Sequence, residues 1–363
     1  MQKKKKTKTL KIPIILSVTF SILIIIVILY FTVDAKTLEN LSKVSLKYEF
    51  FLIAILLNIL YWILWGARLK ILANTMDKNV KISLFESTRI VIANLFLACI
   101  TPSMAGGEPV RIHLLNKDGL SLGCATAAVL GERLMDAIFI LILVPIALFI
   151  FKDVIDLGFI SIGLTIGTVV FVLLLVFFIY AIIRPDKTKA FLISLSKKFS
   201  RFSKKKDSGI KIIRRINHEV DNFHKSMYSF SGDNKKSLIL ASILTVLFWS
   251  SGFLIPSMIL LGLGLPPYFV ESYTAQILLL VIIMMPTTPG SSGVAEIGIY
   301  GLYGVLIGTT SNTLIGVFII LYRFVTFHMN LIAGAFFQYR IFKSVASFSL
   351  DMIKKPNGKC KSK

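Results

Sequence analysis

Long apolar runs separated by short polar stretches fill most of the chain. Crossing the hydrocarbon layer of a membrane, roughly 30 Å thick, takes about 20 helical residues. Several runs approach or reach that length and carry almost no charge; they lie at residues 14–30, 50–65, 137–151, 159–183, 238–261, 277–285 and 314–321. The pattern predicts an all-α integral membrane protein.

The first apolar run follows a basic segment, which is also how a secretory signal peptide begins. The run is long for a signal peptide, and no cleavage site with small residues follows it at residues 32–36. We therefore expect it to stay in the protein as the first membrane helix.

Positive charge gathers in three places, and the formal net charge of the chain is +22. Residues 1–11 hold six lysines and no acid, residues 184–236 hold 15 Lys/Arg against 5 acids, and the tail from Arg340 holds seven Lys/Arg against Asp351. Basic loops stay in the cytoplasm and attract anionic lipid headgroups. No basic motif is interleaved with aromatic residues, so we expect no nucleic-acid partner.

The segment 82–100 decides how the chain threads through the membrane. If it crossed, the basic stretch 184–236 would fall outside the cell, against the positive-inside rule. If it turns at 101–109 and returns, that stretch stays inside, and the two prolines and adjacent glycines of the break cannot continue a helix. A second break of this kind lies at 286–293. The sequence predicts about six transmembrane helices plus two re-entrant hairpins.

This threading divides the chain into five parts with both termini in the cytoplasm. They are a basic N-terminus (1–11), a first membrane half (12–183) with its break near 101–109, a basic loop (184–237), a second membrane half (238–339) with its break near 286–293, and a basic tail (340–363). Arg68, which follows the second apolar run, is placed at the cytoplasmic side together with Lys70. The expected location is the plasma membrane, crossed several times.

The two breaks resemble each other at nearly constant spacing. Thr101-Pro102 recurs as Thr288-Pro289 and Gly106 as Gly293, both 187 residues later; Glu108 recurs as Glu296 after 188, and Arg133 as Arg323 after 190. Because the threading brings the hairpins in from opposite sides, we predict an inverted internal repeat. Interrupted segments in such repeats indicate a binding site near the membrane midplane. The alternative is that both breaks are ordinary loops between helices.

Ionisable residues inside apolar segments need partners or water, since a central charge costs roughly 2.5–3.5 kcal/mol on insertion scales. Seven fall in such segments: Glu86, Arg89, Glu132, Arg133, Asp136, Glu296 and Arg323. Arg133 and Arg323 either neutralise carboxylates as buried ion pairs or bind an anionic headgroup, because a guanidinium donates two parallel hydrogen bonds to phosphate. Helices that start after Gly107 and Gly293 would offer N–H groups to an anion, unless Glu108 and Glu296 cap them.

The residues that we expect to bind a lipid headgroup come from the breaks and the helices that follow them. They are Thr101, Pro102, Gly106, Gly107, Glu108, Arg111, Glu132, Arg133, Asp136, Thr288, Pro289, Gly290, Gly293, Glu296, Tyr322 and Arg323. Three cysteines and four histidines form no ligand cluster, so we expect no metal and no cofactor. No nucleotide-binding P-loop pattern is present, which excludes transport powered by this chain's own ATP hydrolysis.

In order along the chain, Thr-Pro-x-x-x-Gly-Gly-Glu-Pro-x-Arg, Gly-Glu-Arg-x-x-Asp, Pro-Thr-Thr-Pro-Gly-Ser-Ser-Gly-Val-Ala-Glu and Tyr-Arg resemble the membrane region of bacterial lysylphosphatidylglycerol synthases and of flippase-like membrane proteins. The resemblance covers residues 9–339. It implies handling or translocation of an anionic phospholipid or a polyprenyl-phosphate lipid. It argues against aminoacyl transfer by this polypeptide, because the tail leaves no room for the soluble acyltransferase domain.

The leading hypothesis is a lipid flippase or lipid-binding transporter, with membrane lipids as partners. A solute or ion transporter is the first alternative, since inverted repeats are common there. A membrane-embedded transferase is the second, with Glu132, Asp136 or Glu296 transferring a proton. The third is an accessory subunit that works with a lipid-modifying synthase or a glycosyltransferase.

Overall fold

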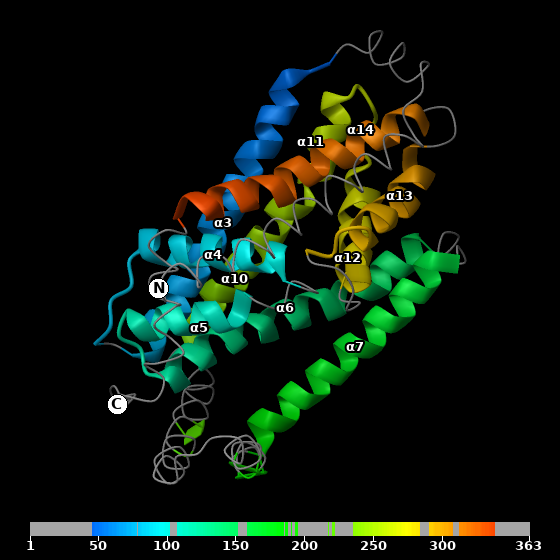
Figure 1. Cartoon of the computed structure of the whole chain (residues 1–363). Helices are drawn as coiled ribbons and strands as arrows, with labels where there is room; N and C mark the ends of the chain where they lie inside the picture. The colour runs from blue at the N-terminus through cyan, green and yellow to red at the C-terminus, as the bar shows by residue number, and fades with distance from the viewer. Residues whose placement is uncertain are drawn as a thin grey trace, which may run out of the picture.

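The computed structural model describes residues 46–77, 79–101, 107–151, 158–184, 235–283, 290–307 and 312–337, with a few short pieces between 186 and 221. Within these ranges every regular element is a helix (Figure 1). The apolar run at 14–30, most of the basic loop, and the basic termini lie outside the described residues, so the predictions made for them stay predictions.

Four of the described helices are long and apolar enough to cross a membrane. They are α3 (Tyr48–Met76), α6 (Leu122–Ile150), α10 with α11 (Lys235–Phe253 and Ile255–Gly262), and α14 (Asn312–Arg323) continued by the π-helix η2 (Phe324–His328) as far as residue 337. The helix α7 (Gly158–Ile183) lies at the edge of this body and packs against α12 (Figure 1). The all-helical membrane fold is therefore confirmed.

Two helical hairpins form where the sequence breaks predict them. The helix α4 (Leu84–Ile100) packs against α5 (Gly107–Lys117), and α12 (Phe269–Ile283) packs against α13 (Val294–Ile307). The first hairpin is closed tightly, since a side chain at Gly107 would collide with the Asn94 side chain on α4. Whether the hairpins enter from opposite sides of the membrane stays a prediction.

The start of α4 shows how Glu86, one of the seven charges in apolar segments, is satisfied. Its partly exposed side chain accepts hydrogen bonds from the backbone N–H and the hydroxyl of Ser83, both at 2.9 Å. The Ser83 hydroxyl accepts in turn from the Glu86 N–H at 3.2 Å, which completes a capping box. A local helix cap, rather than a buried partner, satisfies this charge.

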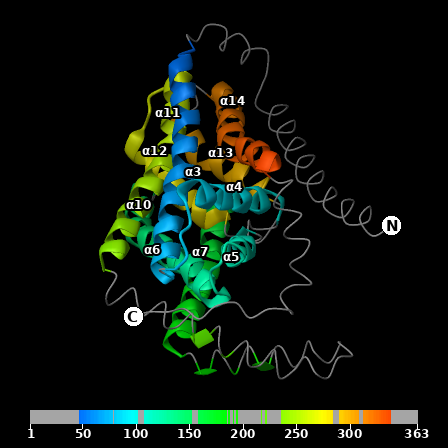
Figure 2. The same ribbon diagram turned by 90° about the vertical axis from the view of Figure 1, so that its left-hand side faces the viewer.

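The helix α3 lies at the centre of the described body, where it packs against α4, α6, α10, α11 and η2 (Figure 2). Small residues allow this close packing: a side chain at Gly66 of α3 would collide with Thr88 of α4. The outward faces of the long helices carry large apolar side chains, such as Leu56, Ile142 and Phe149, which are 54%, 64% and 75% exposed. Such a surface suits lipid and not water.

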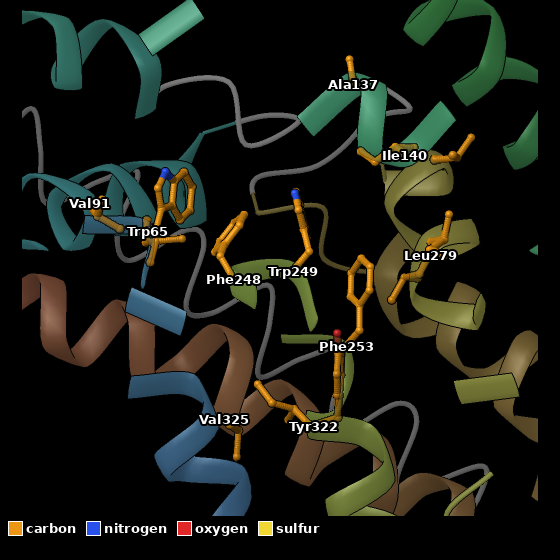
Figure 3. Close-up of a cluster of buried hydrophobic side chains, with 14 of the residues drawn as sticks. Trp65, Val91, Ala137, Ile140, Phe248, Trp249, Phe253, Leu279, Tyr322 and Val325 are labelled. Carbon is orange, nitrogen blue, oxygen red and sulfur yellow. The ribbon is translucent and has the colours of Figure 1, made fainter. Parts of the chain in front are cut away.

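A row of aromatic rings fills the core between α3 and α10 (Figure 3). The ring centroids of Trp65 and Phe248 lie 5.1 Å apart, those of Phe248 and Trp249 lie 4.7 Å apart, and those of Trp249 and Phe253 lie 5.3 Å apart. Two of these side chains contact charged residues: the Phe248 ring centroid lies 4.7 Å from the Arg68 guanidinium, and the indole N–H of Trp249 donates to Asp136 at 2.9 Å. The charged site described next therefore lies beside this aromatic row.

Candidate functional site

Six charged side chains gather between α3, α5 and α6. We call this group the first charge cluster, and its members are Arg68, Glu108, Arg111, Glu132, Arg133 and Asp136. They come from α3 and from the consecutive helices α5 and α6, and α10 contributes neutral partners. The cluster combines three arginines with three carboxylates.

Arg68 connects the two most deeply buried carboxylates of the cluster. Its Nε lies 3.1 Å from Glu132 Oε1, and its Nη1 lies 2.5 Å from Asp136 Oδ1. Nη1 also donates to the hydroxyl of Thr245 on α10 at 3.1 Å, and the guanidinium lies 4.7 Å from the ring centroid of Phe248. The side chain of Arg68 is fully buried, so it holds three helices together at this point.

Both carboxylates also accept hydrogen bonds from other residues. Glu132 Oε2 accepts from Arg111 Nη1, so Glu132 bridges α3 and α5. Asp136 Oδ1 accepts from the indole N–H of Trp249 at 2.9 Å, and Asp136 Oδ2 accepts from Arg133 at 3.2 Å. Charged groups that lose water need such complete sets of hydrogen bonds.

The pair formed by Arg133 and Glu108 closes the cluster on its most exposed side. Arg133 Nη2 lies 2.9 Å from Glu108 Oε1, and the two side chains are 33% and 29% exposed. The side chains of the other four members are at most 4% exposed. A molecule approaching the cluster therefore meets Arg133 and Glu108 first.

The position of Arg68 is a correction to the sequence analysis. The apolar run was expected to end near Trp65 and to leave Arg68 at the cytoplasmic side, but α3 continues to Met76 and buries Arg68 completely. Its long chain places the guanidinium between two acids that the sequence analysis had already marked as costly to bury. The unmatched acids Glu132 and Asp136 were the signal that an additional cation was needed.

The two hairpin breaks meet directly. The backbone N–H of Gly290, in the second break, donates to the carbonyl oxygen of Thr101, in the first break, at 3.1 Å. Gly290 has φ of +62°, and a side chain there would come within 2.6 Å of the Cys99 carbonyl oxygen. A glycine is required at this position because of both its backbone angle and the close approach. Pro102, Gly106, Thr288 and Pro289 lie outside the described residues.

A second, smaller ion pair follows the second break. Arg323 on α14 lies 2.8 Å from Glu296 on α13 and donates to the Ser292 hydroxyl at 3.1 Å, with its guanidinium 4.1 Å from the Phe327 ring centroid. Glu296 also accepts from the Gly293 N–H at 2.6 Å and so caps the start of its own helix. The interpretation of Arg323 as half of a buried ion pair matches this geometry.

Tyr322, a predicted headgroup ligand, takes part in a buried polar network in the second half. Its hydroxyl donates to Gln276 Oε1 at 2.6 Å, Gln276 Nε2 donates to the Tyr303 hydroxyl at 2.8 Å, and that hydroxyl donates to the Ser272 carbonyl at 3.1 Å. This network joins α12, α13 and α14. The sequence carried no signal for it, because tyrosine and glutamine are ordinary residues at a helix interface.

Comparison with known proteins agrees with this architecture. The family model described as the lysylphosphatidylglycerol synthase TM region matches residues 14–334. A UPF0104 membrane protein of Archaeoglobus fulgidus is 35% identical over 298 residues, which are 81% of this chain and 87% of that protein. A UPF0104 membrane protein of Methanothermobacter thermautotrophicus is 25% identical over 285 residues, 74% and 76% of the two chains. No solved structure matches significantly. The chain is a membrane protein that belongs to the family of the lysylphosphatidylglycerol synthase membrane region.

Proposed function

We propose that this protein is a lipid translocase or lipid-binding transporter, and that its cargo is an anionic phospholipid or a polyprenyl-phosphate lipid. The observation that carries the proposal is the meeting of the two hairpin breaks inside an apolar helical body that also buries the first charge cluster. Backbone without helical hydrogen bonds is tolerated at membrane depth only where protein or a water-filled cavity covers it. A polar path beside apolar helix faces is what a headgroup needs while its tails stay in lipid.

The arginines favour an anionic headgroup over a neutral one. Arg133 is partly exposed at the edge of the cluster, and a guanidinium binds phosphate through two parallel hydrogen bonds. The predicted headgroup ligands Arg111, Glu132, Arg133 and Asp136 all lie in one group with Glu108. Arg323 and Glu296 form a separate pair, so the proposed contact with the headgroup is made mainly by the first half of the chain.

Reconstitution in liposomes tests the proposed function. The wild-type protein should accelerate the movement of fluorescent phosphatidylglycerol between leaflets, measured as the fraction of label that an added reductant quenches. Arg133→Gln should slow this movement by about tenfold, since a hydrogen bond to a charged group contributes roughly 1.5–3 kcal/mol. Arg89→Gln, which removes an arginine of the first hairpin outside the cluster, is the matched control. Equal rates with and without wild-type protein would contradict the proposal.

We also propose that the protein lies in the plasma membrane with both termini in the cytoplasm, because all three basic regions then obey the positive-inside rule. In a variant without its native cysteines, a cysteine at Ser203 should react only from the cytoplasmic side, and one at Ser45 only from outside. Labelling of the Ser203 position by an impermeant reagent in intact cells would reverse this orientation.

A further inference from the structure

We infer that Trp65, Arg111 and Arg133 form a subsite for the oxygen atoms of a phosphate-class anion, and that Glu108 takes the place of this anion on Arg133 while the subsite is empty. The inference deepens the proposed function. It rests on that proposal only where it names a lipid headgroup as the source of the anion. It rests on hydrogen-bond donors, on their common location and on the charge balance of the cluster.

Four buried N–H donor atoms around the first charge cluster have no acceptor in the described part of the chain. They are Trp65 Nε1, Arg111 Nε, Arg111 Nη2 and Arg133 Nε. Arg111 is fully buried and Trp65 is 4% exposed. A buried donor without a partner costs about 1–3 kcal/mol, and more when the group is charged. So many unpartnered donors in one place indicate a missing acceptor.

These donors belong to side chains that surround one ring. The guanidinium carbons of Arg111 and Arg133 lie 5.2 Å and 5.6 Å from the ring centroid of Trp65. In Figure 3 the Trp65 nitrogen lies on the same side of the aromatic row as the Trp249 nitrogen, which donates to Asp136. Indole and guanidinium groups only donate hydrogen bonds. A partner that they share must therefore be an acceptor, and an anion is favoured over water once Glu108 leaves the charge of Arg133 unbalanced.

The charge balance indicates which group gives way when an anion binds. Three arginines match three carboxylates in the cluster, so an added anion would leave an excess of negative charge in a region of low dielectric constant. Glu132 and Asp136 each accept from two or more residues and are at most 4% exposed. Glu108 is 29% exposed and has a single described ion pair, with Arg133. Glu108 is the carboxylate that can return to water.

Binding therefore exchanges one acceptor for another at Arg133. The anion takes the Arg133 guanidinium from Glu108 and also satisfies the free N–H groups of Arg111 and Trp65. Glu108 then acts as a competitor that keeps the cluster neutral between binding events. Removal of its charge should strengthen anion binding, whereas a purely structural ion pair would show no such effect.

Isothermal titration of the purified full chain tests the subsite with two probes, dihexanoyl phosphatidylglycerol and inorganic phosphate. Glu108→Gln should bind the anion about tenfold more tightly, and Trp65→Phe about tenfold more weakly, because one hydrogen bond to a charged group is lost. Arg111→Lys should weaken binding as much as Trp65→Phe, since the charge remains but the fork is lost. Tighter binding of the lipid than of inorganic phosphate identifies a headgroup; equal affinities identify a free anion in the same subsite.

Trp62→Phe is the matched control, because Trp62 lies one turn earlier on α3 and its indole N–H already donates to Asn330 at 2.8 Å. This variant should lower the melting temperature and leave anion affinity within about twofold of wild type. Trp65→Phe should instead lower the anion affinity about tenfold, because the hydrogen bond that it removes is the one made to the anion.

Unchanged affinity in Trp65→Phe, or no gain in Glu108→Gln, would overturn the subsite and mean that water alone satisfies these donors. The proposed function would survive that result if the wild type still moves lipid in liposomes. Conversely, anion binding that depends on Trp65 without any lipid movement would refute the translocase and leave the subsite standing.

Discussion

Arg68 binds several charged and polar partners in and around the first charge cluster. It binds two carboxylates and a hydroxyl and lies over the Phe248 ring, all without contact with solvent. Its removal would leave Glu132 and Asp136 buried beside α3 with one cation fewer. Arg133, by contrast, is one-third exposed, and water can replace part of its contribution.

The two arginines should therefore differ strongly in their effect on stability. Arg68→Met should destabilise the protein by about 3–5 kcal/mol, the usual result of leaving buried charges unpaired. Arg133→Met should cost less than half of that, because Glu108 can be hydrated. Denaturant titration in detergent, followed by circular dichroism, measures both. A larger loss in Arg133→Met than in Arg68→Met would contradict the assignment of Arg68 as the central cation.

The sequence predicted some of these residues and missed others for identifiable reasons. Charges such as Glu132, Arg133 and Arg323 stand out because they interrupt apolar segments, and each is paired in the structure. Arg68 lies just beyond an apolar run, where an arginine is ordinarily a boundary residue. Trp65 looks like any core aromatic, because the state of its N–H depends on helices that meet it only in the folded protein.

At the level of elements, prolines and glycines in the sequence predicted both hairpins, and in the structure α4 packs against α5 and α12 against α13. The contact between the breaks could not be predicted, because it depends on how the two halves dock. The π-helix after Arg323 was also missed, since its residues fit ordinary helical periodicity. Within this π-helix the Val325 carbonyl accepts from Asn58 of α3 at 2.9 Å.

Gly290 offers a test of the contact between the breaks. Gly290→Ala should destabilise the protein by about 1–3 kcal/mol, because its φ of +62° strains any other residue and the new methyl group meets Phe327 at 2.5 Å. It should also slow lipid movement. Gly304→Ala on α13 is the control, since nothing lies within 4 Å of the added methyl group. Equal melting temperatures for the two variants would show that the breaks do not touch.

At the level of the whole molecule, α3 connects the two halves of the chain. Asn58 and Trp62 on this helix donate to Val325 and Asn330 in the last helix, while Arg68 binds the acids of α6. These positions follow one side of α3, although the helix as a whole is apolar. A movement of one half against the other must therefore break or exchange hydrogen bonds along this one helix.

The equal numbers of acids and bases at the site also have an electrical consequence. Arg68, Arg111, Arg133 and Arg323 balance Glu108, Glu132, Asp136 and Glu296, so these eight residues have no net formal charge. Moving one elementary charge through 100 mV takes about 2.3 kcal/mol, but moving a neutral group as a unit takes none. The membrane potential therefore exerts no net force on this assembly while it moves as a unit, and a voltage dependence of transport would report the charge of the cargo or the separate movement of Glu108.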